Sequence, residues 1–159
     1  MEYPERKQLR LKGYDYSNPG KYFVTICTRE KKSLLSNIIL DNDPCSAPKI
    51  KLSDIGIETE KSIKYINDNY KDVEIEKYVI MPNHIHLIMV LNESGGHGNP
   101  PLQSIIGQLK SYTTKKYGSQ LWQRSYYDHI IRNEQDYKKI WEYIESNPGK
   151  WTEDLYYCM

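Results

Sequence analysis

Two histidines, His84 and His86, stand two positions apart in an apolar segment, and imidazoles at this spacing are suited to metal chemistry. If residues 84–91 form a strand, both imidazoles point to one face, while Ile85 and Leu87 point to the other face and into a core. Two neutral imidazoles on one face can bind one divalent ion. Two ligands are too few for a structural zinc site, whereas a third protein ligand with open positions would make a catalytic site. The pair is short, and taken by itself it is more often an ordinary feature of a strand than a metal site.

A second pair with chemical potential, Tyr143 and Asn147, lies four positions apart in a segment of helical periodicity. At about 100° per residue, the two side chains form one stripe at the edge of the apolar face, where a side chain can reach a cleft beside a sheet. A tyrosine hydroxyl can attack a phosphodiester and hold DNA covalently, and an amide oxygen can be the third ligand of an ion that stabilises the developing charge. The alternative is structural: Tyr143 packs at the helix edge and Asn147 caps the helix.

The elements that would position these pairs follow from hydrophobic periodicity. Alternating or β-branched segments predict strands over 22–28, 73–80, 84–91 and 125–131. Helical spacing predicts three helices. The first follows Ser53 as N-cap and carries Ile55, Thr59, Ile63, Ile66 and Tyr70; the second runs from Pro101 to Gly118; the third runs from Asn133 to Asn147 and is closed by Pro148. Residues 41–48 and 93–100 are predicted loops. The order β-α-β-β-α-β with a C-terminal helix is typical of an α+β, ferredoxin-like sandwich with an antiparallel sheet.

The composition is that of one folded domain over residues 1–159, with a formal net charge of only +1. Nucleic-acid binding would therefore need a local basic patch. Candidate phosphate contacts are Lys12, Lys110, Lys115, Arg124 and Arg132, although each is also compatible with an ordinary solvated charge. Tyr112, Tyr126 and Tyr127 are aromatic residues suited either to stacking on bases or to core and edge packing.

The remaining cysteines and histidines suggest no second site. Cys27, Cys45 and Cys158 are far apart and odd in number, which argues against a disulfide framework and for a reducing compartment. With no apolar run of about 18 residues and no signal-peptide pattern, we expect a cytoplasmic protein that does not enter a membrane. His97 falls in the Gly-rich loop, and His129 is expected to be a hydrogen-bonded residue of the fourth strand.

Four ordered segments together resemble one family. They are GKYFVT at 20–25, YVIMPNHIH at 78–86, LWQRSYYDHIIR at 121–132 and YIESNP at 143–148. This set is similar to the REP-associated tyrosine transposases, relatives of the single-tyrosine HUH transposases, and the similarity runs over nearly the whole chain. The middle segment alone is weakly specific, but the ordered set of four is strong.

The resemblance implies a ferredoxin-like fold and one divalent ion, Mg²⁺ or Mn²⁺, held by His84 and His86 with Asn147 as third ligand. Histidine ligands favour Mn²⁺ over Mg²⁺. It also implies that Tyr143 is the nucleophile, and that the enzyme cuts single-stranded DNA to a 5′-phosphotyrosine and a free 3′-hydroxyl. The expected partner is a DNA hairpin or palindromic repeat beside the cut, bound by a monomer or a homodimer.

Two alternatives remain open at this point. A ferredoxin-like sheet with exposed aromatic residues can also hold single-stranded nucleic acid without chemistry. A metal-dependent nuclease would use water in place of tyrosine. A pure binding module has no need of His84, His86, Tyr143 and Asn147 together, so the complete set favours the enzyme.

Overall fold

The computed structural model describes residues 18–40, 42–43, 45–92 and 101–153, whose central feature is a four-stranded antiparallel sheet in the order β4-β5-β1-β6. The strands are β1 (Gly20–Cys27), β4 (Val73–Ile80), β5 (His84–Leu91) and β6 (Tyr127–Ile131). The first strand of this sheet along the chain, β1, thus lies between the last two, β5 and β6. This arrangement confirms the predicted ferredoxin-like α+β fold.

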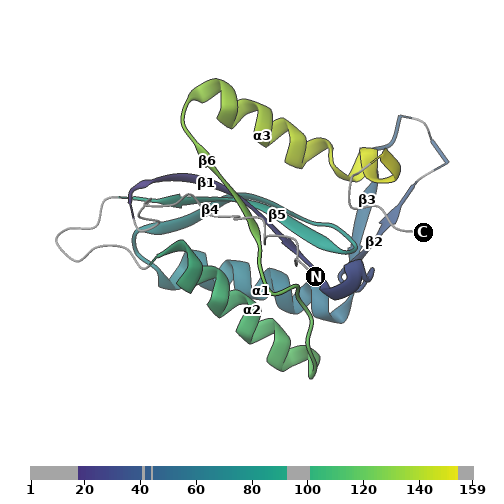
Figure 1. Cartoon of the computed structure of the whole chain (residues 1–159). Helices are drawn as coiled ribbons and strands as arrows, with labels where there is room; N and C mark the ends of the chain where they lie inside the picture. Colours follow the sequence, from purple (N-terminus) through teal and green to yellow (C-terminus); the bar gives the residue numbers. More distant parts are fainter. Residues whose placement is uncertain (1–17, 41, 44, 93–100, 154–159) are drawn as a thin grey trace, which may run out of the picture.

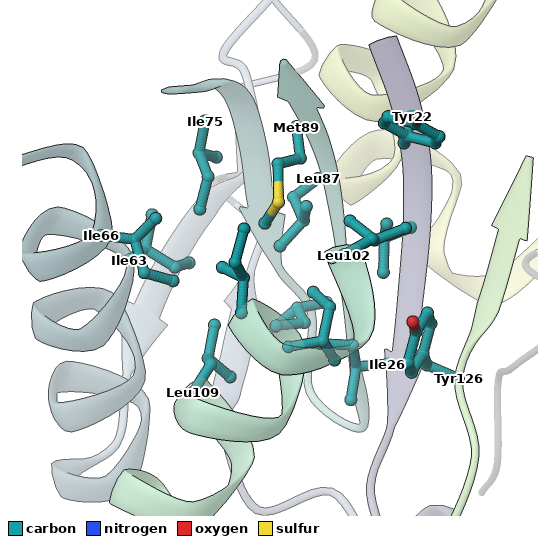
Figure 2. Packing of buried hydrophobic residues seen from close by; sticks show 14 of the residues in the cluster. Tyr22, Ile26, Ile63, Ile66, Ile75, Leu87, Met89, Leu102, Leu109 and Tyr126 are labelled. Atoms are coloured by element: carbon teal, nitrogen blue, oxygen red, sulfur yellow. The ribbon is translucent and has the colours of Figure 1, made fainter. Parts of the chain in front are cut away.

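Helices α1 (Asp54–Asn69) and α2 (Leu102–Tyr117) cover one face of the sheet (Figure 1). The predicted N-cap of α1 and the predicted C-cap of α2 are both present. The Ser53 hydroxyl accepts a hydrogen bond from the Gly56 amide at 3.1 Å, and Gly118 closes α2 in the left-handed region at φ 88°. The larger core lies between these helices and the sheet, as Figure 2 shows. Its labelled members include Ile63 and Ile66, Leu102 and Leu109, and the strand residues Tyr22, Ile26, Leu87 and Met89.

Helix α3 (Glu134–Ser146) crosses the opposite face of the sheet (Figure 1). As predicted, Asn133 caps it, because its Oδ1 accepts from the Asp136 amide at 2.8 Å. A smaller core under α3 contains Phe23, Val79, Met81, Ile88, Val90 and Ile144. As predicted, α3 ends before Pro148, and Asn147 is its C-cap. Pro148 then begins the separate 3₁₀ segment η2 (Pro148–Glu153), where its missing N–H costs little.

A short hairpin is the element that the sequence patterns did not predict. Strands β2 (Ser36–Ile39) and β3 (Lys49–Leu52) pair with each other in a separate two-stranded sheet on either side of the predicted loop. A 3₁₀ turn, η1 (Arg29–Lys31), precedes them. The hairpin is joined to the main sheet where the Ser36 hydroxyl donates to the Ile80 carbonyl at 2.9 Å.

Two strand boundaries differ from those predicted. β1 begins two residues earlier than expected and ends at Cys27, while β6 begins at Tyr127, later than the expected start at 125. Tyr126 is instead buried in the larger core. None of the described helices has the length and apolar character needed to cross a bilayer.

Candidate active site beneath α3

The two histidines of β5 lie side by side on the face of the sheet that α3 covers. Both are buried, at 0% and 1% exposure for His84 and His86, and their ring centroids are 4.5 Å apart. Ile85 and Leu87 point into the larger core on the other face. The same-face arrangement predicted from strand alternation is therefore present, and it is enclosed by protein on both sides of the sheet.

Each imidazole is held through its Nδ1 atom. Nδ1 of His84 lies 2.8 Å from Oδ1 of Asn83, and Nδ1 of His86 lies 2.7 Å from Oγ1 of Thr25. Thr25 is directly opposite His86 in the β1–β5 register. Phe23 stacks on the His86 ring at a centroid distance of 5.3 Å. These contacts fix both rings. They involve Nδ1 of each ring, so a metal ion would bind at Nε2.

Burial lowers the pKa of His86 well below its ordinary value of 6.5, and the neighbouring His84 lowers it further. The cause is the cost of placing an imidazolium in a water-poor site next to a second imidazole. His86 is therefore neutral at neutral pH, which is the protonation state that a metal ligand requires.

Tyr143 of α3 and Trp151 of η2 contact the histidine pair, and Asn147 lies between them along the chain. The centroids of the Tyr143 and His86 rings are 5.2 Å apart, and those of the Trp151 and His84 rings are 6.0 Å apart. Asn147 stands midway between Tyr143 and Trp151 in the sequence and is only 3% exposed. The segment from Tyr143 to Trp151 thus passes over the histidine pair with Asn147 between its two ring contacts.

The side chains of His84, His86 and Asn147 carry atoms of the types that bind a divalent ion. Oδ1 of Asn147 and Nε2 of each histidine ring are buried and make no hydrogen bond within the part of the chain that the structure describes. Imidazole nitrogen and amide oxygen are both suitable ligands for Mn²⁺. Among the described residues no group of three His, Cys, Asp or Glu side chains converges, so an ion here would need a ligand of another type, which Asn147 can supply.

Tyr143 differs from Asn147 in its access to solvent. It is 42% exposed, and its ring meets that of Phe23 edge-on at 6.2 Å. A ligand can therefore reach the tyrosine from solvent, whereas the amide four residues later is enclosed. The helix edge predicted from the sequence is where this transition between solvent and core occurs.

The N-terminal half of α3 is attached to the sheet by polar contacts that the sequence patterns did not reveal. The Tyr137 hydroxyl donates to Glu76 of β4 at 2.6 Å, and the Lys21 ammonium lies 3.5 Å from the same carboxylate and 4.1 Å from the centre of the Tyr137 ring. Burial and the Glu76 hydrogen bond raise the pKa of Tyr137 to about 12. These contacts hold the helix that carries Tyr143.

Three of the predicted DNA contacts are brought together. Lys110, Lys115 and Arg124 line one groove of about 290 Å³ at the end of α2, and the Lys110 ammonium donates to the carbonyls of Gln123 and Arg124 at 2.7 and 3.1 Å. Arg132 is exposed just after β6 and does not line that groove. Lys12 lies outside the described residues.

The three tyrosines considered for base stacking and the two remaining histidines lie elsewhere in the protein. Tyr126 packs in the core, while Tyr112 and Tyr127 are exposed. The Tyr112 hydroxyl donates to Glu58 at 2.9 Å. His129 is hydrogen-bonded as expected, with Nε2 2.7 Å from Oδ2 of Asp136, and His97 lies outside the described residues.

A ferredoxin-like α+β domain with a tyrosine-bearing helix over a buried histidine pair is the class that this geometry defines. The fold is shared with a solved structure of the REP-associated tyrosine transposase bound to a REP hairpin, at a TM-score of 0.67 and 24% identity, over 92% of this chain and 74% of that one. No family model matches the chain.

Three relatives are similar to this chain in sequence. An uncharacterized protein of Haemophilus influenzae is 34% identical over 96% of this chain and 93% of its own length. The REP-associated tyrosine transposase of Escherichia coli is 35% identical over 48% of this chain and 45% of its own, and a putative REP-associated tyrosine transposase of H. influenzae is 26% identical over 86% and 74%. The chain is therefore similar in sequence to REP-associated tyrosine transposases and shares the fold of one of them.

Proposed function

We propose that this chain cuts and rejoins single-stranded DNA by transesterification, with Tyr143 as the nucleophile and one divalent ion, Mg²⁺ or Mn²⁺, held by His84, His86 and Asn147. The observation that carries the proposal is the position of the half-exposed Tyr143 ring, whose centroid is 5.2 Å from that of the His86 ring, on the helix that ends at the buried Asn147. Sequence similarity to REP-associated tyrosine transposases supports this chemistry.

The cleavage step balances without an external energy source. The Tyr143 oxygen forms a bond to the scissile phosphorus, the bond from phosphorus to the 3′-oxygen breaks, and the phenolic proton is lost while the 3′-oxygen gains one. The products are a 5′-phosphotyrosine and a free 3′-hydroxyl. Rejoining is the reverse reaction with a 3′-hydroxyl as nucleophile, so one phosphodiester bond is conserved throughout.

The protein side chains orient the reactants. When bound, the ion supplies Lewis-acid stabilisation of the charge that develops on the scissile phosphate. Thr25 and Asn83 hold the imidazole rings, and Phe23 packs on His86, so the ligand side chains are positioned before DNA arrives. Tyr143 is set at the border of this enclosed region, where a phosphodiester can approach from solvent.

The proposed substrate is a DNA hairpin or palindromic repeat with a single-stranded segment beside it. Support comes from the solved structural neighbour, whose bound partner is a REP hairpin. The groove of Lys110, Lys115 and Arg124 gives this chain a local cationic surface despite its net charge of +1.

Replacing the nucleophile is the direct test. Tyr143→Phe should abolish cleavage of single-stranded DNA while leaving DNA binding within about twofold, because only the attacking oxygen is removed. Tyr65→Phe, which changes an exposed tyrosine of α1, is the matched control and should cleave normally. Cleavage should be measured with DNA labelled on the 3′ side of the cut, which becomes attached to protein in the wild type.

Each alternative has its own outcome in this experiment. Full cleavage by Tyr143→Phe would remove the tyrosine from the mechanism and leave a water nucleophile, in which case no labelled DNA becomes attached to protein. Tight binding without cleavage by the wild-type protein, across a range of hairpins and with Mn²⁺ present, would instead favour the non-catalytic binding module.

A further inference from the structure

The amide of Asn83 is fixed in one orientation. The residue is fully buried in the turn before β5, and its Nδ2 donates to the carbonyl of Lys31 at 3.3 Å. Its own carbonyl accepts from the Thr28 amide at 2.9 Å and from the Thr28 hydroxyl at 3.1 Å. Since a carbonyl oxygen accepts and never donates, the NH₂ group must face Lys31, and Oδ1 must face His84.

This orientation determines where the proton of His84 lies. Oδ1 of Asn83 is an acceptor, and it is 2.8 Å from Nδ1 of His84. The contact is a hydrogen bond only if Nδ1 carries the proton. The neutral ring then has its lone pair on Nε2, which is a buried atom on the face under α3.

His86 is held differently. Its Nδ1 lies 2.7 Å from the Thr25 hydroxyl, a group that can either donate or accept. Thr25 therefore stabilises both neutral tautomers of His86, whereas Asn83 stabilises only one tautomer of His84. The two histidines share a face but differ in how firmly their proton position is determined.

We propose that Asn83 is a positioning residue that fixes the Nδ1–H tautomer of His84 and so presents Nε2 as a ready ligand, while Thr25 adapts to either tautomer of His86. The hydrogen bonds alone determine the tautomer. The role of Nε2 as a ligand rests on the proposed function, because it requires His84 to bind the ion. Partners of this kind orient metal-binding imidazoles and typically change metal affinity about 10- to 100-fold when removed.

The first arm of the test needs neither metal nor DNA. The whole chain, labelled with ¹⁵N-histidine, is studied by NMR at neutral pH, and the His84 ring should show Nδ1–H as the single neutral form. Asn83→Leu, which keeps the side-chain size and removes the acceptor, should give a mixture of tautomers. Asn83→Asp, which keeps an acceptor oxygen, should retain Nδ1–H.

The second arm measures Mn²⁺ affinity by calorimetry on the same proteins. Asn83→Leu should weaken binding about 10- to 100-fold, and Asn83→Asp should bind at least as well as the wild type. Ser36→Ala removes a buried hydrogen bond to the Ile80 carbonyl without changing any contact of the two imidazole rings, and it controls for general loss of packing. Equal Mn²⁺ affinity in the Leu and Asp variants would overturn the positioning role.

The two proposals fail in distinguishable ways. A His84 ring protonated at Nε2 in the wild type overturns the inference even if Asn83→Leu does not fold. A wild-type protein that shows Nδ1–H but binds no Mn²⁺ overturns the metal site of the proposed function and leaves the tautomer assignment standing.

Discussion

At the scale of single residues, one stripe of α3 gives two side chains opposite environments. Tyr143 is 42% exposed and Asn147 is 3% exposed, although they are four residues apart on the same helix edge. Beyond Asn147 the chain continues into η2, where Trp151 packs near His84. A nucleophile has to meet DNA, whereas a neutral amide is an effective ligand only where water does not compete, so this gradient suits the proposed roles.

Loss of one imidazole should disable the metal-dependent reaction. His84→Ala leaves one imidazole and one amide oxygen, and we expect cleavage to fall by about 100-fold or more in a Mn²⁺ titration. His129→Gln, which alters a half-exposed histidine bonded to Asp136, should cleave at the wild-type rate. If His84→Ala cleaves as well as the wild type at every Mn²⁺ concentration, His84 is not a ligand.

The candidate site was predictable only where its residues are close in sequence. His84 with His86, and Tyr143 with Asn147, form pairs whose shared face follows from the period of one strand or one helix. Thr25 is 61 residues from His86 and is paired with it only through the β1–β5 register, which no local pattern specifies. Asn83 is adjacent to His84, yet its role depends on the Lys31 carbonyl, a contact over 52 residues.

At the scale of elements, those that depend on contacts local in sequence were predicted, whereas the element that depends on distant contacts was not. The caps at Ser53, Asn133 and Gly118 involve neighbours within four residues, and all three helices were predicted from them and from apolar spacing. The β2–β3 hairpin has strands of only four residues, and it is joined by a hydrogen bond to a distant residue, Ile80. Such short strands form because of tertiary contacts and not because of local preference.

The start of α1 passes so close to the β2 segment that only glycine fits. A Cβ atom on Gly56 would lie 2.0 Å from the Leu35 carbonyl oxygen, so Gly56→Ala must displace backbone. We expect a loss of about 2 kcal/mol or more in the free energy of unfolding, although alanine is the better helix former. The matched control is Gly107→Ala in α2, where nothing lies within 4 Å and a gain of about 0.5–1 kcal/mol is expected.

Chemical denaturation of the two variants beside the wild type measures both changes. Opposite signs are the expected result, because the two glycines differ in surroundings and not in secondary structure. A stable Gly56→Ala protein would show that the β2 segment moves away from α1 at little cost.

At the scale of the whole molecule, the net charge is only +1, yet three basic side chains line one groove near one end of the sheet. The groove of Lys110, Lys115 and Arg124 includes Trp122 and Gln123. That segment is tied to the end of β1, because the Gln123 amide donates to the Cys27 carbonyl at 2.9 Å. Cys27 is the register partner of His84, so the groove adjoins the histidine end of the sheet. A neighbouring groove of about 280 Å³ contains Arg29 and Lys32 and shares Gln120 with the first.

The groove should make a measurable contribution to the salt dependence of DNA binding. Lys115 and Arg124 are both exposed, whereas the Lys110 ammonium is committed to two backbone carbonyls, so the double change Lys115→Gln with Arg124→Gln removes charge without removing a structural bond. Each phosphate contact contributes about 0.7 for a single strand and about 0.9 for a duplex to the slope of log K against log salt, so the slope should become shallower by about 1.4 to 1.8. Lys61→Gln with Lys64→Gln on α1 changes the net charge equally and should leave the slope unaltered, because those residues lie outside the groove. Fluorescence anisotropy with a labelled hairpin at several salt concentrations gives both slopes, and equal slopes for the two double variants would place the DNA on another surface.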